Sequence, residues 1–169
     1  MTSAQTRSPG GGKMGSVSLH VDERLHELMG IALGEAELAL ASEDVPIGAV
    51  VTDASGAVIA TAHNERELTG DPTGHAEVLA LRRAAERLGT WRLDGCTLVV
   101  TLEPCAMCAG AILSARIGTL VYGAWDDKAG AVGSRYDLVR DRRLPERAVV
   151  IAGVREAECG ALVRGFFRD

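Results

Sequence analysis

The residue types with the clearest chemical potential lie in two short segments of this 169-residue chain. The first is His75-Ala76-Glu77, and the second, beginning 29 residues after His75, is Pro104-Cys105-Ala106-Met107-Cys108. Each segment alone is a weak signal, since a lone His-x-Glu is mostly coincidental and a Cys-x-x-Cys can be a redox pair. Together they supply one imidazole and two thiolates, a ligand set that suits zinc.

Helices must position these groups if they are to meet. Cys105 and Cys108 are three residues apart and so share one helix face, in the first turn, where free N–H groups and the helix dipole favour thiolate. His75 and Glu77 would diverge by about 200° along a helix body. Both can reach one metal only if it lies beyond the helix N-terminus. We therefore predict two helix N-termini that converge on one zinc ion.

The number of ligands separates a catalytic site from a structural one. Three protein ligands leave the fourth tetrahedral position for water, which ionises near pH 7 on zinc, and Glu77 is predicted to carry its proton. One alternative is a closed structural site with Cys96 or Cys159 as the fourth ligand, although free cysteines are commonly just buried apolar residues. A redox Cys-x-x-Cys pair is another alternative, but it leaves His75 and Glu77 without a role.

The remaining sequence alternates between helical and strand periodicity, which predicts a layered α/β sheet. The expected helices are 21–41, 75–88, about 105–116 and about 158–167, with Gly89 capping the second, and the expected strands are 47–52, 57–62, 97–102, 119–123 and 148–154. The first two strands flank residues 53–56 and are expected to form a hairpin. Residues 63–74 are expected to form a polar loop.

Composition sets outer limits on the class of protein. The chain is 47% apolar and carries a net charge of −5, which argues against a protein that grips long stretches of phosphate backbone. Four cysteines make a poor disulfide scaffold, and no apolar run approaches the roughly 20 residues of a membrane span. We expect a cytoplasmic protein in which residues 1–16, rich in Gly, Ser and Thr, form a disordered tail. Residues 17–169 are expected to form a single domain.

The pairing of His-x-Glu with Pro-Cys-x-x-Cys resembles the signature of the zinc-dependent cytidine-deaminase-like superfamily. Within it, the chain resembles the bacterial tRNA-specific adenosine deaminase family from about residue 22 to residue 168. The segments that carry this resemblance are 45–50, 63–64, 71–77, 101–112, 116–118, 122–124, 130–131, 133–134, 158–159 and 166–167, with Asp126 and Lys128. The resemblance implies a three-layer α/β/α fold with a central mixed sheet of about five strands.

The same resemblance implies a reaction, hydrolytic deamination of adenosine to inosine at the wobble position of an arginine tRNA anticodon. One zinc ion per subunit would be held by His75, Cys105 and Cys108. Zinc-activated water would attack C6 of adenine, and Glu77 would act as the proton shuttle. The implied partners are the tRNA anticodon stem-loop and a second subunit that helps to build the RNA site, without a membrane or DNA.

The resemblance also implies residues that bind the substrate. Asn64 would hydrogen-bond the flipped-out adenine, Glu103 would help to form the pocket through its backbone, and Asp126 with Lys128 would contact neighbouring nucleotides. Structural alternatives stay open, since Asn and Asp are common as turn or capping residues. For residues 166–167, core packing in a terminal helix is favoured over RNA stacking.

Three departures from the family pattern concern RNA handling. Trp125 stands where Arg is common, Gly74 stands where Ala is common, and the chain ends at Asp169 without further basic residues. A deaminase of a free base or nucleoside, such as guanine, cytosine or cytidine, therefore stays an alternative, because it needs the same apparatus. A non-catalytic RNA-binding protein with structural zinc is a third reading, against which Glu77 argues.

Overall fold

The computed structural model describes the backbone of residues 15–168 and the side chains of residues 23–168. Five strands form one sheet in the order β2-β1-β3-β4-β5. The strands are β1 (Gly48–Thr52), β2 (Val58–His63), β3 (Thr97–Leu102), β4 (Thr119–Ala124) and β5 (Val149–Ile151). β1 pairs antiparallel with β2 and β3, whereas β3, β4 and β5 run parallel. This mixed five-stranded sheet confirms the predicted fold class.

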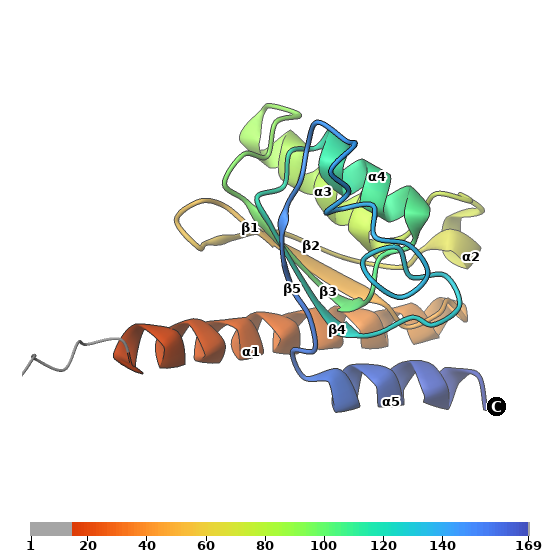
Figure 1. The fold of residues 1–169 in the computed structure, drawn as a ribbon. Coiled ribbons are helices and arrows are strands. Elements are labelled where there is room, and N and C mark those ends of the chain that lie inside the picture. Colours follow the sequence, from red (N-terminus) through yellow and green to blue (C-terminus); the bar gives the residue numbers. More distant parts are fainter. Residues whose placement is uncertain (1–14, 169) are drawn as a thin grey trace, which may run out of the picture.

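Helices cover both faces of the sheet and make the three layers (Figure 1). The first layer contains α1 (Gly15–Leu38), its 3-10 extension η1 (Ala39–Ser42) and α5 (Glu156–Phe166). The opposite layer contains α3 (Ala76–Leu88) and α4 (Ala106–Ser114), with the short α2 (Arg66–Thr69) at their end. The chain thus has a buried sheet between two helical layers, as the alternating periodicity predicted.

Each face of the sheet has its own apolar core, because successive strand residues point to opposite sides. Val50, Val99 and Val121 face α1 and α5, and all three are fully buried. Val51 and Val100 belong to the cluster on the α3 and α4 side. The central strands are therefore apolar on both faces, which is typical of a sheet covered by helices.

Gly48 fixes how closely α1 approaches the sheet. A Cβ atom at this position would lie 1.9 Å from the carbonyl oxygen of Ala32 and 2.6 Å from the backbone nitrogen of Ala36. Only glycine permits this contact between a strand and the backbone of a helix. The start of β1, which borders the candidate site, is consequently held against α1.

The predicted elements agree with the structure except at several ends. The hairpin and the left-handed cap at Gly89 are confirmed, but the predicted loop 63–74 contains α2. The helix predicted over 105–116 ends at Ser114, because Arg116 adopts a left-handed conformation with φ 63°. The strand predicted over 148–154 is shorter, since the chain turns at Gly153 with φ 81°.

The N-terminal prediction is only partly covered by the structure. Residues 1–14 of the predicted tail lie outside the described residues, and α1 begins at Gly15. Helix α5 begins at Glu156, two residues before the predicted start. Among the described helices, none combines the length and apolar character needed to span a membrane.

Candidate active site

The candidate site lies at one end of the sheet, where the carboxyl ends of several strands lie side by side. His63 at the end of β2 pairs with Gly48 at the start of β1, and β1 runs antiparallel to β3. Because β3 and β4 are parallel, the chain leaves β2, β3 and β4 at the same end. The residues that follow these strands include Asn64, Glu103 and Asp126, so the topology collects three of the predicted substrate-binding residues.

Two helices begin at this end and bring the predicted metal ligands together. His75 directly precedes α3 and Cys105 directly precedes α4. The Nδ1 atom of His75 lies 3.7 Å from the Sγ atom of Cys105 and 3.5 Å from that of Cys108. Zinc bonds of about 2.0–2.3 Å at a tetrahedral angle separate an N and an S ligand by about 3.6 Å. The observed spacing therefore fits a zinc ion.

The pKa values of the two thiols are shifted in opposite directions. Hydrogen bonds from Cys108 and His75 lower the pKa of Cys105 to about 4, although burial opposes this shift. The adjacent Cys105 sulfur and burial raise the pKa of Cys108 far above its ordinary value. A divalent cation stabilises both sulfurs as thiolates, so this donor set is suited to one.

Glu77 lies in the first turn of α3 with only 4% of its surface exposed. Burial raises the pKa of its carboxyl group to about 7, against the lowering effects of its own backbone N–H and of His75. The carboxyl group also contacts the thiol of Cys108. A buried carboxyl that exchanges a proton near neutral pH beside a metal site is suited to general acid–base chemistry.

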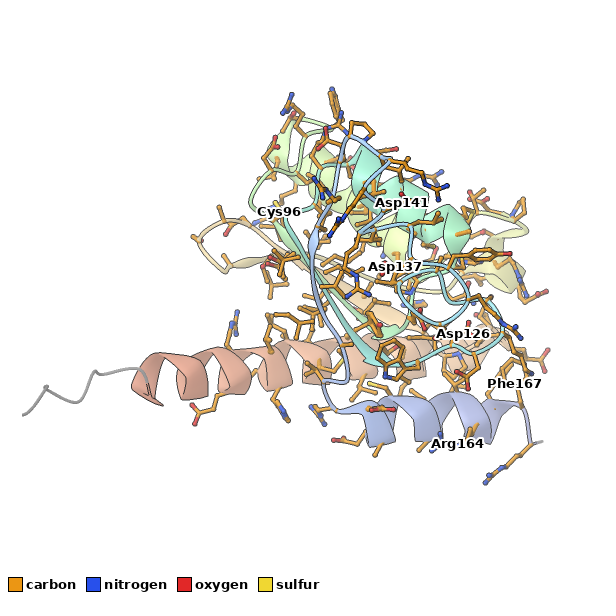
Figure 2. All side chains as sticks on the ribbon, in the orientation of Figure 1. Cys96, Asp126, Asp137, Asp141, Arg164 and Phe167 are labelled. Carbon is orange, nitrogen blue, oxygen red and sulfur yellow. The ribbon has the colours of Figure 1, made fainter. Side chains whose placement is uncertain are left out.

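The two other cysteines lie away from this group. Cys96 precedes β3 at the opposite end of the sheet from Asp126 (Figure 2). Cys159 is buried in α5 on the other face, within reach of Gly123 and the carbonyl of Val154. Within the described part of the chain, the group able to hold a metal consists of His75, Cys105 and Cys108. The closed site with a fourth cysteine therefore has no candidate ligand there.

The side chains of Asn64 and Asp126 both accept hydrogen bonds from backbone N–H groups that follow them closely in the chain. Asn64 is buried, donates from Nδ2 to the carbonyl of Val45 at 3.3 Å and accepts from the backbone N–H of Arg66. Asp126 Oδ1 accepts from the backbone N–H groups of Lys128 and Ala129. The side chain of Lys128 is exposed. These contacts agree with the turn and capping alternatives, and the roles in substrate binding stay predictions.

Hydrogen bonds to the Glu103 carboxylate join the segment after β4 to the residues that precede Cys105. The carboxylate accepts hydrogen bonds from the backbone N–H of Asp126 (2.9 Å), Val132 (3.0 Å) and Ser134 (2.9 Å), and also from the Ser134 hydroxyl. The N–H of Ala131 also donates to the carbonyl oxygen of Pro104. The loop that carries Asp126 is thus joined at several points to the residues beside Cys105.

The prediction for residues 166–167 needs a correction. Phe167 is 69% exposed, so it is not a core residue, whereas Phe166 is half-buried. Their rings meet edge to face with centroids 5.2 Å apart. Phe167 follows the last turn of α5 and borders a groove that the loop after β4 also lines.

Sequence reasoning missed two residues that organise the site. Asp44 is fully buried and accepts from the backbone N–H of Glu67 and Leu68, which joins α2 to the segment between η1 and β1. Ser134 donates to Glu103 from both its backbone and its hydroxyl. Their partners lie 23 to 31 residues away in the chain, so no local pattern could reveal them.

Comparison with known proteins agrees with the chemistry of the site. The profile of MafB19-like deaminases matches residues 24–169. The tRNA-specific adenosine deaminase of Bacillus subtilis (strain 168) is 46% identical over 138 residues, which are 82% of this chain and 85% of that protein.

Two solved structures also share the fold. One, from a study of A-to-I editing by tRNA:A34 deaminases, has a TM-score of 0.77 at 43% identity and covers 80% of this chain and 98% of its own. The other, a guanine deaminase from Nitrosomonas europaea, has a TM-score of 0.71 at 29% identity over 85% of each chain. The chain therefore belongs to the MafB19-like deaminase family, and its predicted similarity to the tRNA-specific adenosine deaminases is confirmed.

Proposed function

We propose that this chain hydrolyses the C6 amine of the wobble adenosine in a tRNA anticodon, giving inosine and ammonia, with an arginine tRNA as substrate. The observation that carries the proposal is the buried carboxyl of Glu77 beside the His75, Cys105 and Cys108 group, in a chain 46% identical to a tRNA-specific adenosine deaminase. A structural metal site has no use for such a carboxyl. The reaction adds one water and releases one ammonia, so atoms balance without a redox partner.

The proposed metal is one zinc ion per subunit, held by His75, Cys105 and Cys108. When bound, zinc supplies an activated water molecule at neutral pH. Glu77 accepts a proton during attack on C6 and returns it to the leaving amine. Its burial keeps that proton from exchanging with bulk water, and its carboxyl group lies in contact with the Cys108 thiol of the ligand group.

The proposed substrate-binding residues surround this centre. The side chain of Asn64 and the backbone of Glu103 would hold the flipped-out base, and Asp126 with Lys128 would contact the nucleotides beside it. An unpaired anticodon loop keeps the cost of extruding one base low. An acidic chain needs only a local set of contacts for such a substrate. A tRNA substrate also assigns the reaction to the cytoplasm.

We further propose that the active form is a homodimer whose second subunit helps to build the RNA site. The supporting feature is an apolar groove of about 400 Å³ between α3 and α4, lined by Leu81, Ala85, Trp91, Ala111 and Ala115, among other residues. Trp91 is 58% exposed there. A contiguous exposed apolar surface commonly marks a protein interface.

The test offers the zinc-loaded protein an anticodon stem-loop with a wobble adenosine, together with free guanine, cytosine, cytidine and adenosine, and measures ammonia and inosine. Inosine from the stem-loop alone is expected. The main alternative is a free-base deaminase, which the similarity to a guanine deaminase structure favours. Product from a free base without product from the stem-loop would replace the proposal by that alternative.

A further inference from the structure

The chain that follows β4 forms no helix or strand until β5 begins at Val149. Its first part is residues 126–134, which we call the 126–134 segment, and Asp126 at its start is marked in Figure 2. Without helical or sheet hydrogen bonds, its shape depends on turns and on side chains from other parts of the chain. Glu103 contributes four of these hydrogen bonds, more than any other side chain outside the segment.

The Glu103 carboxylate binds both ends of this segment. It is only 2% exposed. Its Oε2 atom accepts from the N–H of Asp126 and the hydroxyl of Ser134, and its Oε1 atom accepts from the N–H groups of Val132 and Ser134. A carboxylate taken out of water needs such donors, and hydrogen bonds to a charged acceptor are stronger than neutral ones. The segment is therefore folded around this one buried group.

Gly130 lies between the carboxylate and Cys105. A Cβ atom on Gly130 would collide with the Glu103 carboxylate, so only glycine lets the backbone pass against it. The same residue pairs with Cys105 in an antiparallel bridge, and the N–H of Ala131 donates to the carbonyl of Pro104 at 2.8 Å. The backbone that Glu103 contacts is thus the backbone that pairs with Cys105.

The two cysteines of the candidate metal site are held in different ways. Cys108 is fully buried within α4, where helical hydrogen bonds fix its backbone. Cys105 precedes α4, is half-buried and has an extended backbone with φ −73° and ψ 175°. Its carbonyl accepts from the N–H of Ala109 in the first turn. On its other side, Cys105 depends on the pairing with the 126–134 segment.

We propose that the Glu103 carboxylate is a positioning residue for Cys105, which it holds in place through the 126–134 segment. The inference rests on the proposed function, because it takes His75, Cys105 and Cys108 as ligands of zinc. Removing an outer partner that orients a metal ligand typically lowers metal affinity by about 10- to 100-fold. The competing explanation is that Glu103 stabilises the fold without acting on Cys105.

Glu103→Gln tests the carboxylate with little change in shape, because it replaces one acceptor oxygen by an NH₂ group. In one orientation this group faces the N–H of Asp126, and in the other it faces the N–H groups of Val132 and Ser134. Either way, at least one buried donor loses its acceptor, which is costly. The 126–134 segment should therefore loosen, and Cys105 with it.

Glu35→Gln is the matched control. Glu35 accepts from the hydroxyl of Thr61 at 2.7 Å and lies 3.0 Å from Nδ1 of His63. The variant makes the same chemical change at another hydrogen-bonded carboxylate. Its partners lie on β2 and not on the 126–134 segment, so it reports the effect of a lost carboxylate on the fold alone.

The experiment measures the zinc affinity of the full-length proteins by competition with a chromogenic chelator. Glu103→Gln should bind zinc about 10- to 100-fold more weakly than wild type, whereas Glu35→Gln should match wild type. Wild-type affinity in Glu103→Gln would overturn the proposal. So would an equal loss in both variants, because it would assign the effect to general destabilisation.

Cobalt(II) in place of zinc shows which ligand moves. The thiolate-to-cobalt absorption of Glu103→Gln should weaken toward that of Cys105→Ser, which has lost this one thiolate, and that of Glu35→Gln should match wild type. A change in fold stability alone would leave the band of the cobalt-loaded protein unaltered. An unaltered band in Glu103→Gln would therefore overturn the positioning of Cys105.

Ser134→Ala keeps the proposal testable if Glu103→Gln does not fold. It removes one of the four donors and leaves the carboxylate in place, so its zinc affinity should fall below that of Glu35→Gln. Affinity equal to this control would overturn the proposal. None of these measurements needs RNA. If wild type binds zinc but forms no inosine, the proposed function fails and the affinities still decide the role of Glu103, whereas a wild type that binds no zinc overturns both.

Discussion

The position of Glu77 explains how one carboxyl group can serve both halves of a hydrolysis. It lies two residues after His75 in the first turn of α3, and its carboxyl group contacts the Cys108 thiol without belonging to the group of His75, Cys105 and Cys108. Burial raises its pKa to about 7, close to the pH at which a proton must be both accepted and returned. A metal ligand held in a fixed ionised state could not carry a proton in this way.

Replacement of Glu77 by glutamine should leave the metal in place and remove the proton carrier. We expect a loss of about 10²- to 10⁴-fold in kcat, the usual contribution of a positioned acid or base, with zinc still at one ion per chain. Inosine formation and atomic absorption measure the two quantities. Glu86→Gln, at an exposed site on the same helix, is the control, and turnover of Glu77→Gln within tenfold of wild type would contradict the role.

Residue spacing was sufficient to predict that His75, Cys105 and Cys108 come together, but not the contacts that the Glu103 side chain makes. His75, Cys105 and Cys108 lie in the first turns of helices whose periodicity is visible in the sequence, so their approach followed from two local patterns. The Glu103 carboxylate instead depends on N–H groups 23 to 31 residues further along. Such contacts exist only after β3 and β4 have paired.

Among the secondary-structure elements, α2 depends most on contacts with other parts of the chain for its stability. A four-residue helix cannot offset the cost of its own nucleation, and α2 has no side-chain cap of its own. The backbone N–H of Arg66 donates to Asn64, and those of the next two residues, Glu67 and Leu68, donate to Asp44 at 2.7 Å and 3.1 Å. This remote cap is why a reading of residues 63–74 in isolation predicted a loop.

The Asp44 cap predicts a pH-dependent contribution to stability. Burial opposes ionisation, but the hydrogen bonds from Glu67, Ser42 and Leu68 outweigh it and hold the pKa of Asp44 below 3.8. Because the folded-state pKa is lowered, this stabilisation is present above pH 3.8 and is lost as pH falls through the folded value. Asp44→Asn should cost about 1–3 kcal/mol at pH 7, and its difference from wild type should shrink below about pH 4.

Urea unfolding at pH 7, 5 and 3.5 measures this difference directly. The free energy gap between wild type and Asp44→Asn should be equal at pH 7 and pH 5 and smaller at pH 3.5. Glu86→Gln provides the control for a surface carboxyl that caps no helix. A gap that widens as the pH falls would show that Asp44 does not stabilise the fold in its ionised form.

At the scale of the whole molecule, the two helical layers present different surfaces. The groove on the α5 side is lined by aromatic side chains together with cationic and carboxylate side chains, whereas the α3 and α4 side has a groove lined mainly by apolar side chains. The first composition suits a nucleic acid and the second suits another protein surface. The order of the strands, and which helices cover which face of the sheet, depend on how the complete chain packs. The periodicity of the sequence could therefore predict the sheet but not the two helical surfaces that cover it.

The apolar groove on the α3 and α4 side therefore predicts the oligomeric state. Light scattering should give twice the 17.7 kDa of one chain. Trp91→Glu and Ser114→Arg each introduce a charge into this groove. A symmetric interface at the groove would have to bury that charge twice, once from each subunit. Both variants should therefore be monomers. Ile31→Glu, at a 40% exposed site on α1, should stay dimeric. If all three variants and wild type are monomers, RNA binding has to be completed within one chain, and the second subunit has no place in the site.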